Sequence, residues 1–197
     1  INTFLNTKSK FPILAEESGK SSNNLGEIFW VVDPLDGTAN YSRNISLCCV
    51  SIALIQNQKP VLGVIYDFNN NDLYEGSINS KAVLNEREIC VSDVLFPKDG
   101  ILITGLPNDT DYSDDALMEM IKGFQKWRKV RMLGSAALAA AYVASGKADL
   151  YKEKRTYLWD VAAGAAIVEA AGGCVTMQNH NNLNQVDVFF SNSKIIE

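Results

Sequence analysis

The sequence predicts a mixed α+β or α/β fold, with an antiparallel sheet in the first half and a mixed α/β second half. In the first half, short apolar runs are separated by turn residues, which is typical of an antiparallel sheet. In the second half, strand-length apolar runs alternate with alanine-rich stretches at helical spacing, which is typical of mixed α/β structure. The pattern changes at residues 97–106, which predicts two domains, 1–100 and 101–197.

The first half is expected to begin with the end of a helix and a loop, followed by strands. Residues 13–15 predict a short strand that ends in Glu16 and Glu17, and residues 28–32 predict a buried strand. Further strands are expected over 47–55, 60–66, 73–76 and 88–91, with hairpin turns at 57–58 and 67–72.

The second half predicts three helices. The first begins after Ser113 or Asp114, which are capping residues. Its apolar positions at helical spacing are Leu117, Met120, Ile121, Phe124 and Trp127. The other two helices are expected over 134–145 and 161–171, and strands over 100–104, 129–133, 148–151, 174–177 and 186–190.

Composition narrows the function classes. With 197 residues, of which 47% are hydrophobic, the chain can bury a sizeable core. A net charge of -5 without a basic stripe argues against nucleic acid as a partner. No apolar run reaches the roughly 18 residues of a membrane span. No signal peptide is visible and the four cysteines lack metal-ligand spacing, so we expect buried thiols in a reducing, cytoplasmic compartment.

The strongest functional signal is the turn DPLDGT at residues 33–38, directly after the buried strand. Pro34 and Gly37 force the chain to turn, so Asp33 and Asp36 lie close together. Two close carboxylates repel each other unless a positive charge lies between them. The turn contains no Lys or Arg, so a hard cation such as Mg²⁺ is the natural partner. The alternative is a polar turn in which Asp caps the chain.

Two further acidic residues follow the same pattern. If the first two strands are neighbours, Glu16 converges with Asp33 and Asp36; on their own, Glu16 and Glu17 are more typical of a solvated turn. Asp160 stands where the last predicted helix begins, either as its N-cap or as part of an anion or metal site.

Together these segments resemble the inositol monophosphatase family of Mg²⁺-dependent, lithium-sensitive phosphatases. The matching segments are residues 15–18 (AEES), 32–41 (VDPLDGTANY), 131–136 (RMLGSA) and 159–164 (WDVAAG), with glycines at 172–173. The resemblance implies a layered α-β-α-β-α fold, whose first two helices and most of whose last helix are absent from this sequence. It also implies hydrolysis of a small phosphate monoester, most simply inositol monophosphate, by a homodimer.

The resemblance also assigns roles to individual residues, with two or three Mg²⁺ ions in each site. The first ion is held by Glu16, Asp33 and the carbonyl of Leu35. The second ion is held by Asp33, Asp36 and Asp160. The attacking water is oriented by Glu16 and the Thr38 hydroxyl. The phosphate faces the backbone N–H groups of Gly37 and Thr38, and the substrate hydroxyls contact Ala136, Glu153 and Asp160.

Several alternatives stay open. Fructose 1,6-bisphosphate, histidinol phosphate and 3′-phosphoadenosine 5′-phosphate are substrates of the same superfamily, although the ending Asn40-Tyr41 favours inositol phosphate. Glu153 lies in a charged segment, 152–157, that could be a solvated loop. A non-catalytic, metal-binding regulatory module is the alternative from another class.

Overall fold

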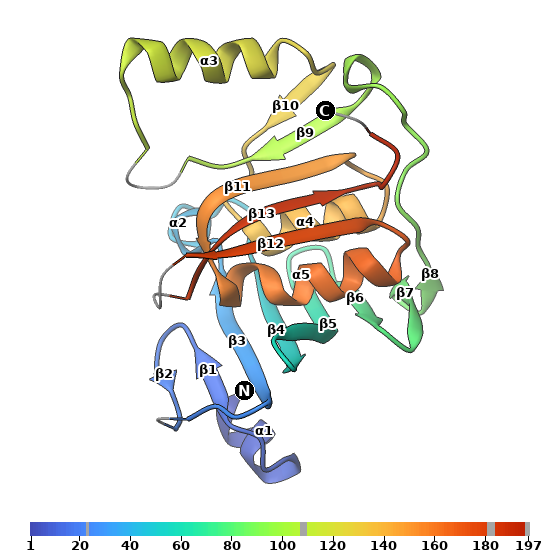
Figure 1. The fold of residues 1–197 in the computed structure, drawn as a ribbon. Coiled ribbons are helices and arrows are strands. Elements are labelled where there is room, and N and C mark those ends of the chain that lie inside the picture. Colours follow the sequence, from blue (N-terminus) through green and yellow to red (C-terminus); the bar gives the residue numbers. More distant parts are fainter. Residues whose placement is uncertain (23, 107–109, 181–183, 196–197) are drawn as a thin grey trace.

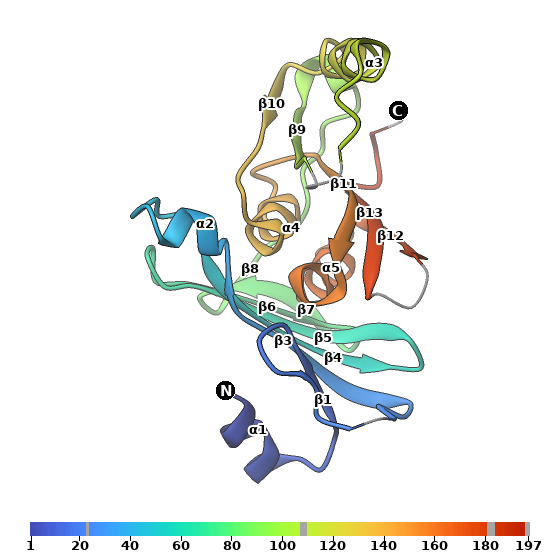
Figure 2. The same ribbon diagram turned by 90° about the vertical axis from the view of Figure 1, so that its left-hand side faces the viewer.

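The structure is a computed structural model that describes residues 1–22, 24–106, 110–180 and 184–195. These residues form two mixed sheets and five α-helices (Figure 1). Helices α4 (Ala136–Ala144) and α5 (Leu158–Ala170) lie between the two sheets, as Figure 2 shows. The mixed, layered α+β fold that the sequence predicts is therefore confirmed.

The larger sheet has the strand order β2-β1-β3-β4-β5-β6-β7-β8. Its strands are β1 (Ile13–Ala15), β2 (Gly19–Lys20), β3 (Ile28–Asp36), β4 (Cys49–Gln56), β5 (Lys59–Asp67), β6 (Asp72–Ser77), β7 (Ser80–Leu84) and β8 (Arg87–Glu88). All neighbours pair antiparallel except β1 and β3, which are parallel. This one parallel pair matters for the site, because it brings the ends of β1 and β3 to the same edge of the sheet.

The sequence does not predict β7, and it places the next strand over 88–91, whereas β8 contains only Arg87–Glu88. The two strands are joined by Asn85 and Glu86, both with positive φ. A turn of this kind usually carries glycine, so Glu86 gives no local signal for it.

The smaller sheet has the order β10-β9-β11-β13-β12. Its strands are β9 (Ile101–Thr104), β10 (Lys129–Arg131), β11 (Leu150–Tyr157), β12 (Cys174–His180) and β13 (Gln185–Ser191). Strand β11 extends well beyond the predicted 148–151, so the segment 152–157 is not a solvated loop but part of this sheet. A bulge between Glu153 and Thr156 interrupts its pairing with β13.

Helix α5 explains why the core joins both sheets. Its residues 161–168 are all buried, as expected for a helix that is apolar on every side. It contacts β4, β5 and β6 on one side and β11, β12 and β13 on the other. The main apolar core therefore contains residues from both halves of the chain, and the division into domains 1–100 and 101–197 stays a prediction.

The remaining helices are short or peripheral: α1 (Asn2–Lys8), α2 (Thr38–Tyr41) and α3 (Asp114–Phe124). Ser113 caps α3 as expected, since its side chain accepts a hydrogen bond from the Ala116 N–H. Trp127, however, lies beyond the end of α3 and packs with Leu102 and Leu150 of the smaller sheet. The helical spacing of Trp127 was therefore misleading, because the helix ends one turn earlier.

The cysteines differ from the expectation of four buried thiols. Cys48 and Cys49 are buried at the start of β4, but Cys90 and Cys174 are exposed. Within the described residues, no helix combines the length and the apolarity needed to cross a bilayer.

Candidate metal centre

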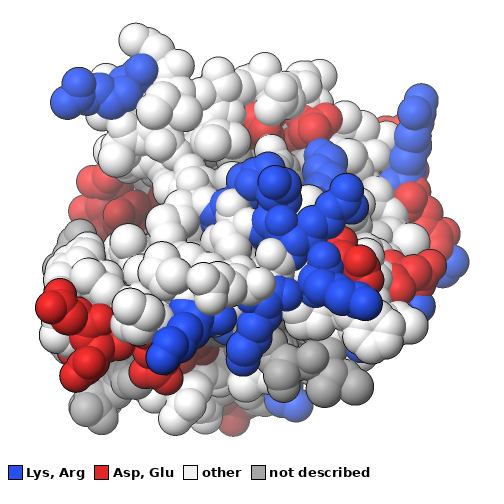
Figure 3. Space-filling model, turned by 90° about the horizontal axis from the view of Figure 1, so that it is seen from above, with Lys and Arg blue, Asp and Glu red and all other residues white. Residues whose placement is uncertain are grey.

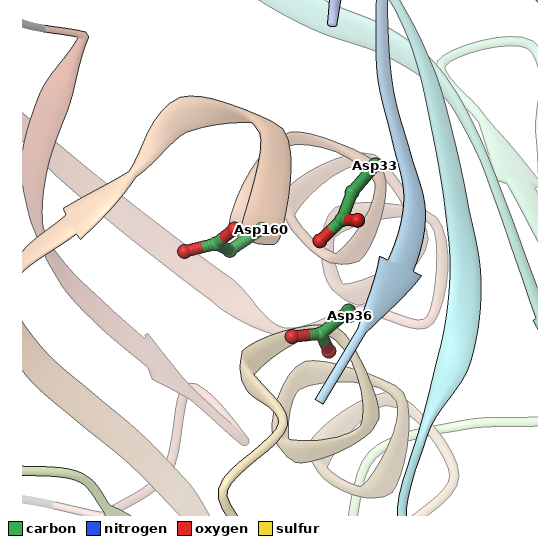
Figure 4. Close-up of side chains that lie close together, drawn as sticks. All are labelled: Asp33, Asp36 and Asp160. Carbon is green, nitrogen blue, oxygen red and sulfur yellow. The ribbon is translucent and has the colours of Figure 1, made fainter. Parts of the chain in front are cut away.

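Three aspartates meet where β3 ends and α5 begins (Figure 4). Asp33 and Asp36 lie in the last four residues of strand β3, where the pairing with β4 is irregular, and Asp160 lies in the first turn of α5. One oxygen from each carboxylate lies within 4.8 Å of the other two. Asp33 and Asp36 are only 1% and 7% exposed, so water does little to screen this cluster of negative charge.

Backbone and hydroxyl donors fix the orientation of two of these carboxylates. Asp33 Oδ1 accepts the Leu35 N–H at 2.9 Å. Asp160 Oδ2 accepts the Thr156 hydroxyl at 3.0 Å and the Tyr157 N–H at 3.1 Å. Asp160 is thus the third residue of α5 in a capping box with Tyr157, and not the N-cap itself.

The Asp36 carboxylate accepts hydrogen bonds from the N-terminus of α4 and from β4. Its Oδ2 accepts the Ala137 N–H at 2.9 Å and the Ser135 hydroxyl, and the Cys49 thiol lies 3.7 Å away as a further donor. Asp36 comes from the first half of the chain and α4 from the second, so this carboxylate ties the two halves together at the site.

Burial and mutual repulsion disfavour the state in which all three aspartates are ionised without a bound cation. Burial, followed by the charge of Asp36, raises the pKa of Asp33 to about 8. The same two causes raise the pKa of Asp160 to about 7. Burial also raises the pKa of Asp36, against the donors that lower it. The main influences on these three pKa values, beside burial, are neighbouring carboxylates and hydrogen-bond donors.

This donor set fits a hard divalent cation. All three groups offer carboxylate oxygen, which is what Mg²⁺ and similar ions prefer, and a cation would relieve their mutual repulsion. The structure therefore contains a cluster of carboxylate oxygens, two of its three members buried and one half-buried, with the chemistry of a cation site.

The structure brings the backbone of Glu16 next to Asp33. In the parallel pair of β1 and β3, Ala15 stands opposite Val32, and the Glu16 N–H donates to the Val32 carbonyl at 3.2 Å. The Glu16 side chain is exposed and is not among the three clustered carboxylates. Its charge still contributes to the raised pKa values of Asp33 and Asp160.

The turn after Asp36 has the tight geometry that its sequence suggests. Gly37 has φ +85, and a Cβ there would lie 2.6 Å from the Leu47 carbonyl oxygen, so only glycine fits without a shift. The Thr38 hydroxyl donates to the Leu35 carbonyl at 2.9 Å, and Thr38 itself is exposed. The turn therefore directs the backbone of residues 37–38 to the surface beside the cluster.

A cavity of about 290 Å³ opens beside the aspartates. Its wall includes four of the expected site residues: Asp36, Ala136, Glu153 and Asp160. The other expected residues, Glu16, Asp33, Leu35, Gly37 and Thr38, lie outside its lining. The cavity thus joins part of the acidic cluster to the part of β11 that carries Glu153.

Glu153 is held in this cavity by two residues that the sequence does not point to. The buried Tyr151 hydroxyl donates to Glu153 Oε2 at 2.9 Å. Gly105, at the end of β9, leaves the space for the carboxylate, because a Cβ there would overlap with Glu153 Oε1. Burial raises the pKa of Glu153.

The charged surface next to the cavity is mixed. Figure 3 shows Lys and Arg gathered on part of the face seen from above, with most Asp and Glu toward the sides. Between α3 and β11, a groove is lined by the basic residues Lys122, Lys126, Lys152, Lys154 and Arg155 and by the acidic residues Asp111, Glu119, Glu153 and Asp187. The fold thus brings basic side chains that are scattered in the sequence together in this groove, with nearly as many acidic side chains.

Ser135 and Cys49 are the other site residues that sequence reasoning misses. A signal for Ser135 existed, since a serine directly before an alanine-rich run is a typical N-cap. No local pattern marks Cys49, because its contact to Asp36 spans two strands of the sheet.

Comparison with known proteins gives consistent matches. The model of the inositol monophosphatase family matches residues 3–196. "Nus factor SuhB" of Xylella fastidiosa is 43% identical over 166 residues, which cover 84% of this chain and 60% of that protein. "Inositol-1-monophosphatase" of Synechocystis is 37% identical over 165 residues, which cover 83% and 58%. A solved inositol monophosphatase structure from Anabaena (Nostoc) matches with a TM-score of 0.88 and 36% identity over 98% of this chain and 78% of that chain. The chain therefore spans 60% and 58% of the length of these two curated relatives.

Proposed function

This chain belongs to the inositol monophosphatase family, and from that membership we propose that the full-length protein is a metal-dependent phosphoric monoester hydrolase. The observation that carries the proposal is the cluster of three carboxylates, two of them buried and the third half-buried, beside a cavity of about 290 Å³. A structural role alone gives no reason to place three mutually repelling carboxylates close together next to an open cavity.

We assign Asp33, Asp36 and Asp160 to metal binding, with Mg²⁺ as the ion. The Glu16 carboxylate and the Leu35 carbonyl complete the proposed ligand set, supported by the position of Glu16 beside Asp33. When bound, such ions activate a water molecule and stabilise the leaving oxygen of a phosphate ester. The capping contacts of Asp160 and the donors behind Asp36 hold the chain's own ligands in place for this task.

The protein groups around the ester have complementary tasks. Glu16 and the Thr38 hydroxyl orient the attacking water, and the backbone N–H groups of Gly37 and Thr38 bind a phosphate oxygen. Substrate hydroxyls contact Glu153, Asp160 and the backbone at Ala136; the position of all three in the cavity wall supports this assignment.

The proposed substrate is a small phosphorylated polyol, most simply inositol monophosphate. A carboxylate inside the cavity, Glu153, favours a substrate rich in hydroxyl donors. Fructose 1,6-bisphosphate, histidinol phosphate and 3′-phosphoadenosine 5′-phosphate are the alternatives. Lithium sensitivity, a homodimeric state and a cytoplasmic location remain expectations from the sequence.

Phosphate release by the full-length protein, measured with and without Mg²⁺ on these four esters, tests the proposal. Mg²⁺-dependent release from one ester supports the reaction class and identifies the substrate. If no ester is hydrolysed although Mg²⁺ binds, the catalytic assignment is wrong for these substrates.

A second candidate function is that of a non-catalytic, metal-binding regulatory protein. The similarity to a relative named as a Nus factor, rather than as a phosphatase, favours it. The two functions separate cleanly, because a regulatory protein would bind Mg²⁺ without turning over any of the four esters.

A further inference from the structure

We propose that Ser135 is a positioning residue for the metal centre, because its hydroxyl holds Asp36 in the orientation needed for cation binding. The inference rests on the proposed metal binding by Asp36. In this role Ser135 does not bind the cation itself; it acts on the metal centre only through Asp36.

The Ser135 hydroxyl lies 3.9 Å from the Cys49 sulfur and makes two shorter hydrogen bonds at once. As the N-cap of α4, Ser135 Oγ accepts the Leu138 N–H at 3.3 Å. The same hydroxyl donates its proton to Asp36 Oδ2. A hydroxyl has one proton to donate and two lone pairs to accept, so both bonds form together. Ser135 is only 4% exposed, and water therefore does not compete for either bond.

This second contact is more than ordinary helix capping. An N-cap needs only to accept a hydrogen bond from its own helix, whereas this one also donates to a carboxylate 99 residues earlier in the chain. The Ala137 N–H donates to the same oxygen, so two donors from the N-terminus of α4 bind one side of the Asp36 carboxylate. Hydrogen bonds to an ionised group are stronger and shorter than neutral ones.

The hydrogen bond from Ser135 matters because two effects disfavour a charged Asp36 carboxylate in this position. Asp33 and Asp160 repel it, and burial disfavours its charge. The donors on Oδ2 oppose both effects, and they fix the carboxylate before any cation arrives. Partners of this kind behind a metal ligand typically change metal affinity or activity by about 10- to 100-fold when they are removed.

The test uses three substitutions of Ser135 in the full-length protein. Ser135→Ala removes both the cap and the hydroxyl. Ser135→Gly removes the hydroxyl but keeps a residue that is tolerated at N-caps, so α4 is less disturbed. Ser135→Thr keeps the hydroxyl. Mg²⁺ affinity is measured by isothermal titration calorimetry, and the melting temperature is measured in EDTA.

We expect Ser135→Ala and Ser135→Gly each to weaken Mg²⁺ binding by about 10- to 100-fold, and Ser135→Thr to restore affinity to within about threefold of the wild type. The matched control is Ser113→Ala, which removes the N-cap of α3, a helix whose residues are not among the hydrogen-bond partners described above for the three aspartates. It should lower the melting temperature without changing the Mg²⁺ affinity.

The possible results separate this inference from the proposed function. If the wild type binds Mg²⁺ but Ser135→Ala and Ser135→Gly bind it within about twofold of the wild type, Ser135 only caps α4 and the positioning role is wrong. The same conclusion follows if Ser135→Thr fails to restore affinity. If the wild type itself binds no Mg²⁺, the metal centre and the positioning role are both wrong.

Discussion

Replacing Asp36 by Asn should make the metal-free protein more stable while abolishing its response to Mg²⁺. Asn has nearly the same shape, and its carbonyl oxygen can accept the hydrogen bonds of Ser135 and Ala137. What is lost is one buried negative charge among three. Because the environment raises the pKa of Asp36 overall, it favours an uncharged group at this position.

The expected gain in stability follows from the effect of Asp36 on its neighbours. The pKa of Asp33 rises from 3.8 to about 8, with burial as the largest cause and the Asp36 charge as the second. Burial persists in the variant, so only the smaller, electrostatic share is recovered. At about 1.4 kcal/mol per pKa unit, we expect the free energy of unfolding in EDTA at pH 7.5 to increase by roughly 1–3 kcal/mol.

Thermal unfolding of the full-length protein measures both effects. In EDTA, the variant should melt a few degrees above the wild type, at about 2–4 °C per kcal/mol for a protein of this size. Mg²⁺ at about 100 times its dissociation constant should stabilise the wild type by about 2.7 kcal/mol and leave Asp36→Asn unchanged. A variant that is destabilised in EDTA and still stabilised by Mg²⁺, or that retains substantial Mg²⁺-dependent phosphate release, would refute the assignment of Asp36 as a ligand.

Three further predictions concern pH, specificity and lithium. Because Asp33 and Asp160 have raised pKa values, about 8 and about 7, the stability they provide is complete below pH 4 and is lost as the pH rises through 7 to 8. The melting temperature in EDTA should therefore fall between pH 5.5 and pH 8.5, and saturating Mg²⁺ should remove most of this fall; an unchanged slope would contradict it. Gly105→Ala should displace Glu153 and raise KM for inositol monophosphate by about tenfold or more, with little effect on p-nitrophenyl phosphate, which lacks ring hydroxyls. Gly123→Ala, which has nothing within 4 Å of the new methyl group, is its control, and equal effects on both substrates would contradict a specificity role. Li⁺ should inhibit Mg²⁺-dependent phosphate release at concentrations at which Na⁺ has no effect, because a small, hard cation fits a carboxylate cluster; equal effects of the two ions would contradict this.

The sequence predicts those parts of the fold and site that depend on local pattern. The apolar run followed by Asp33, Pro34 and Gly37 predicts the end of a strand from local signals alone, although β3 continues through Pro34 and ends only at Asp36, directly before Gly37. Asp33 and Asp36 therefore converge within an irregular end of the strand, where the register with β4 shifts between them. The convergence of Glu16 required one further condition, that β1 and β3 are neighbours; their parallel pairing brings the Glu16 backbone beside β3, but its exposed side chain lies outside the three-carboxylate cluster.

The parts that sequence reasoning misses depend on contacts between distant segments. Glu153 looks solvated in the sequence because charged residues surround it, but β11 continues through this segment and turns Glu153 toward the cavity. Its partner Gly105 lies 48 residues earlier, and Ser135 lies 99 residues after Asp36. No periodicity relates positions so far apart, because only the packing of α4 and β11 against the rest of the core brings them together.

Local and long-range hydrogen bonds together explain why the acidic cluster is stable enough to exist in the fold. Each of the three aspartates accepts a backbone N–H: Asp160 accepts that of Tyr157 at the start of α5, Asp36 that of Ala137 in α4, and Asp33 that of Leu35 in the irregular end of β3. Removing any of these carboxylates therefore relieves electrostatic repulsion but also leaves backbone N–H groups without their acceptor. Asn avoids this second cost and Ala does not. Asp→Asn and Asp→Ala variants at one position should consequently differ in stability, and that difference measures how strongly the metal centre and the fold depend on each other.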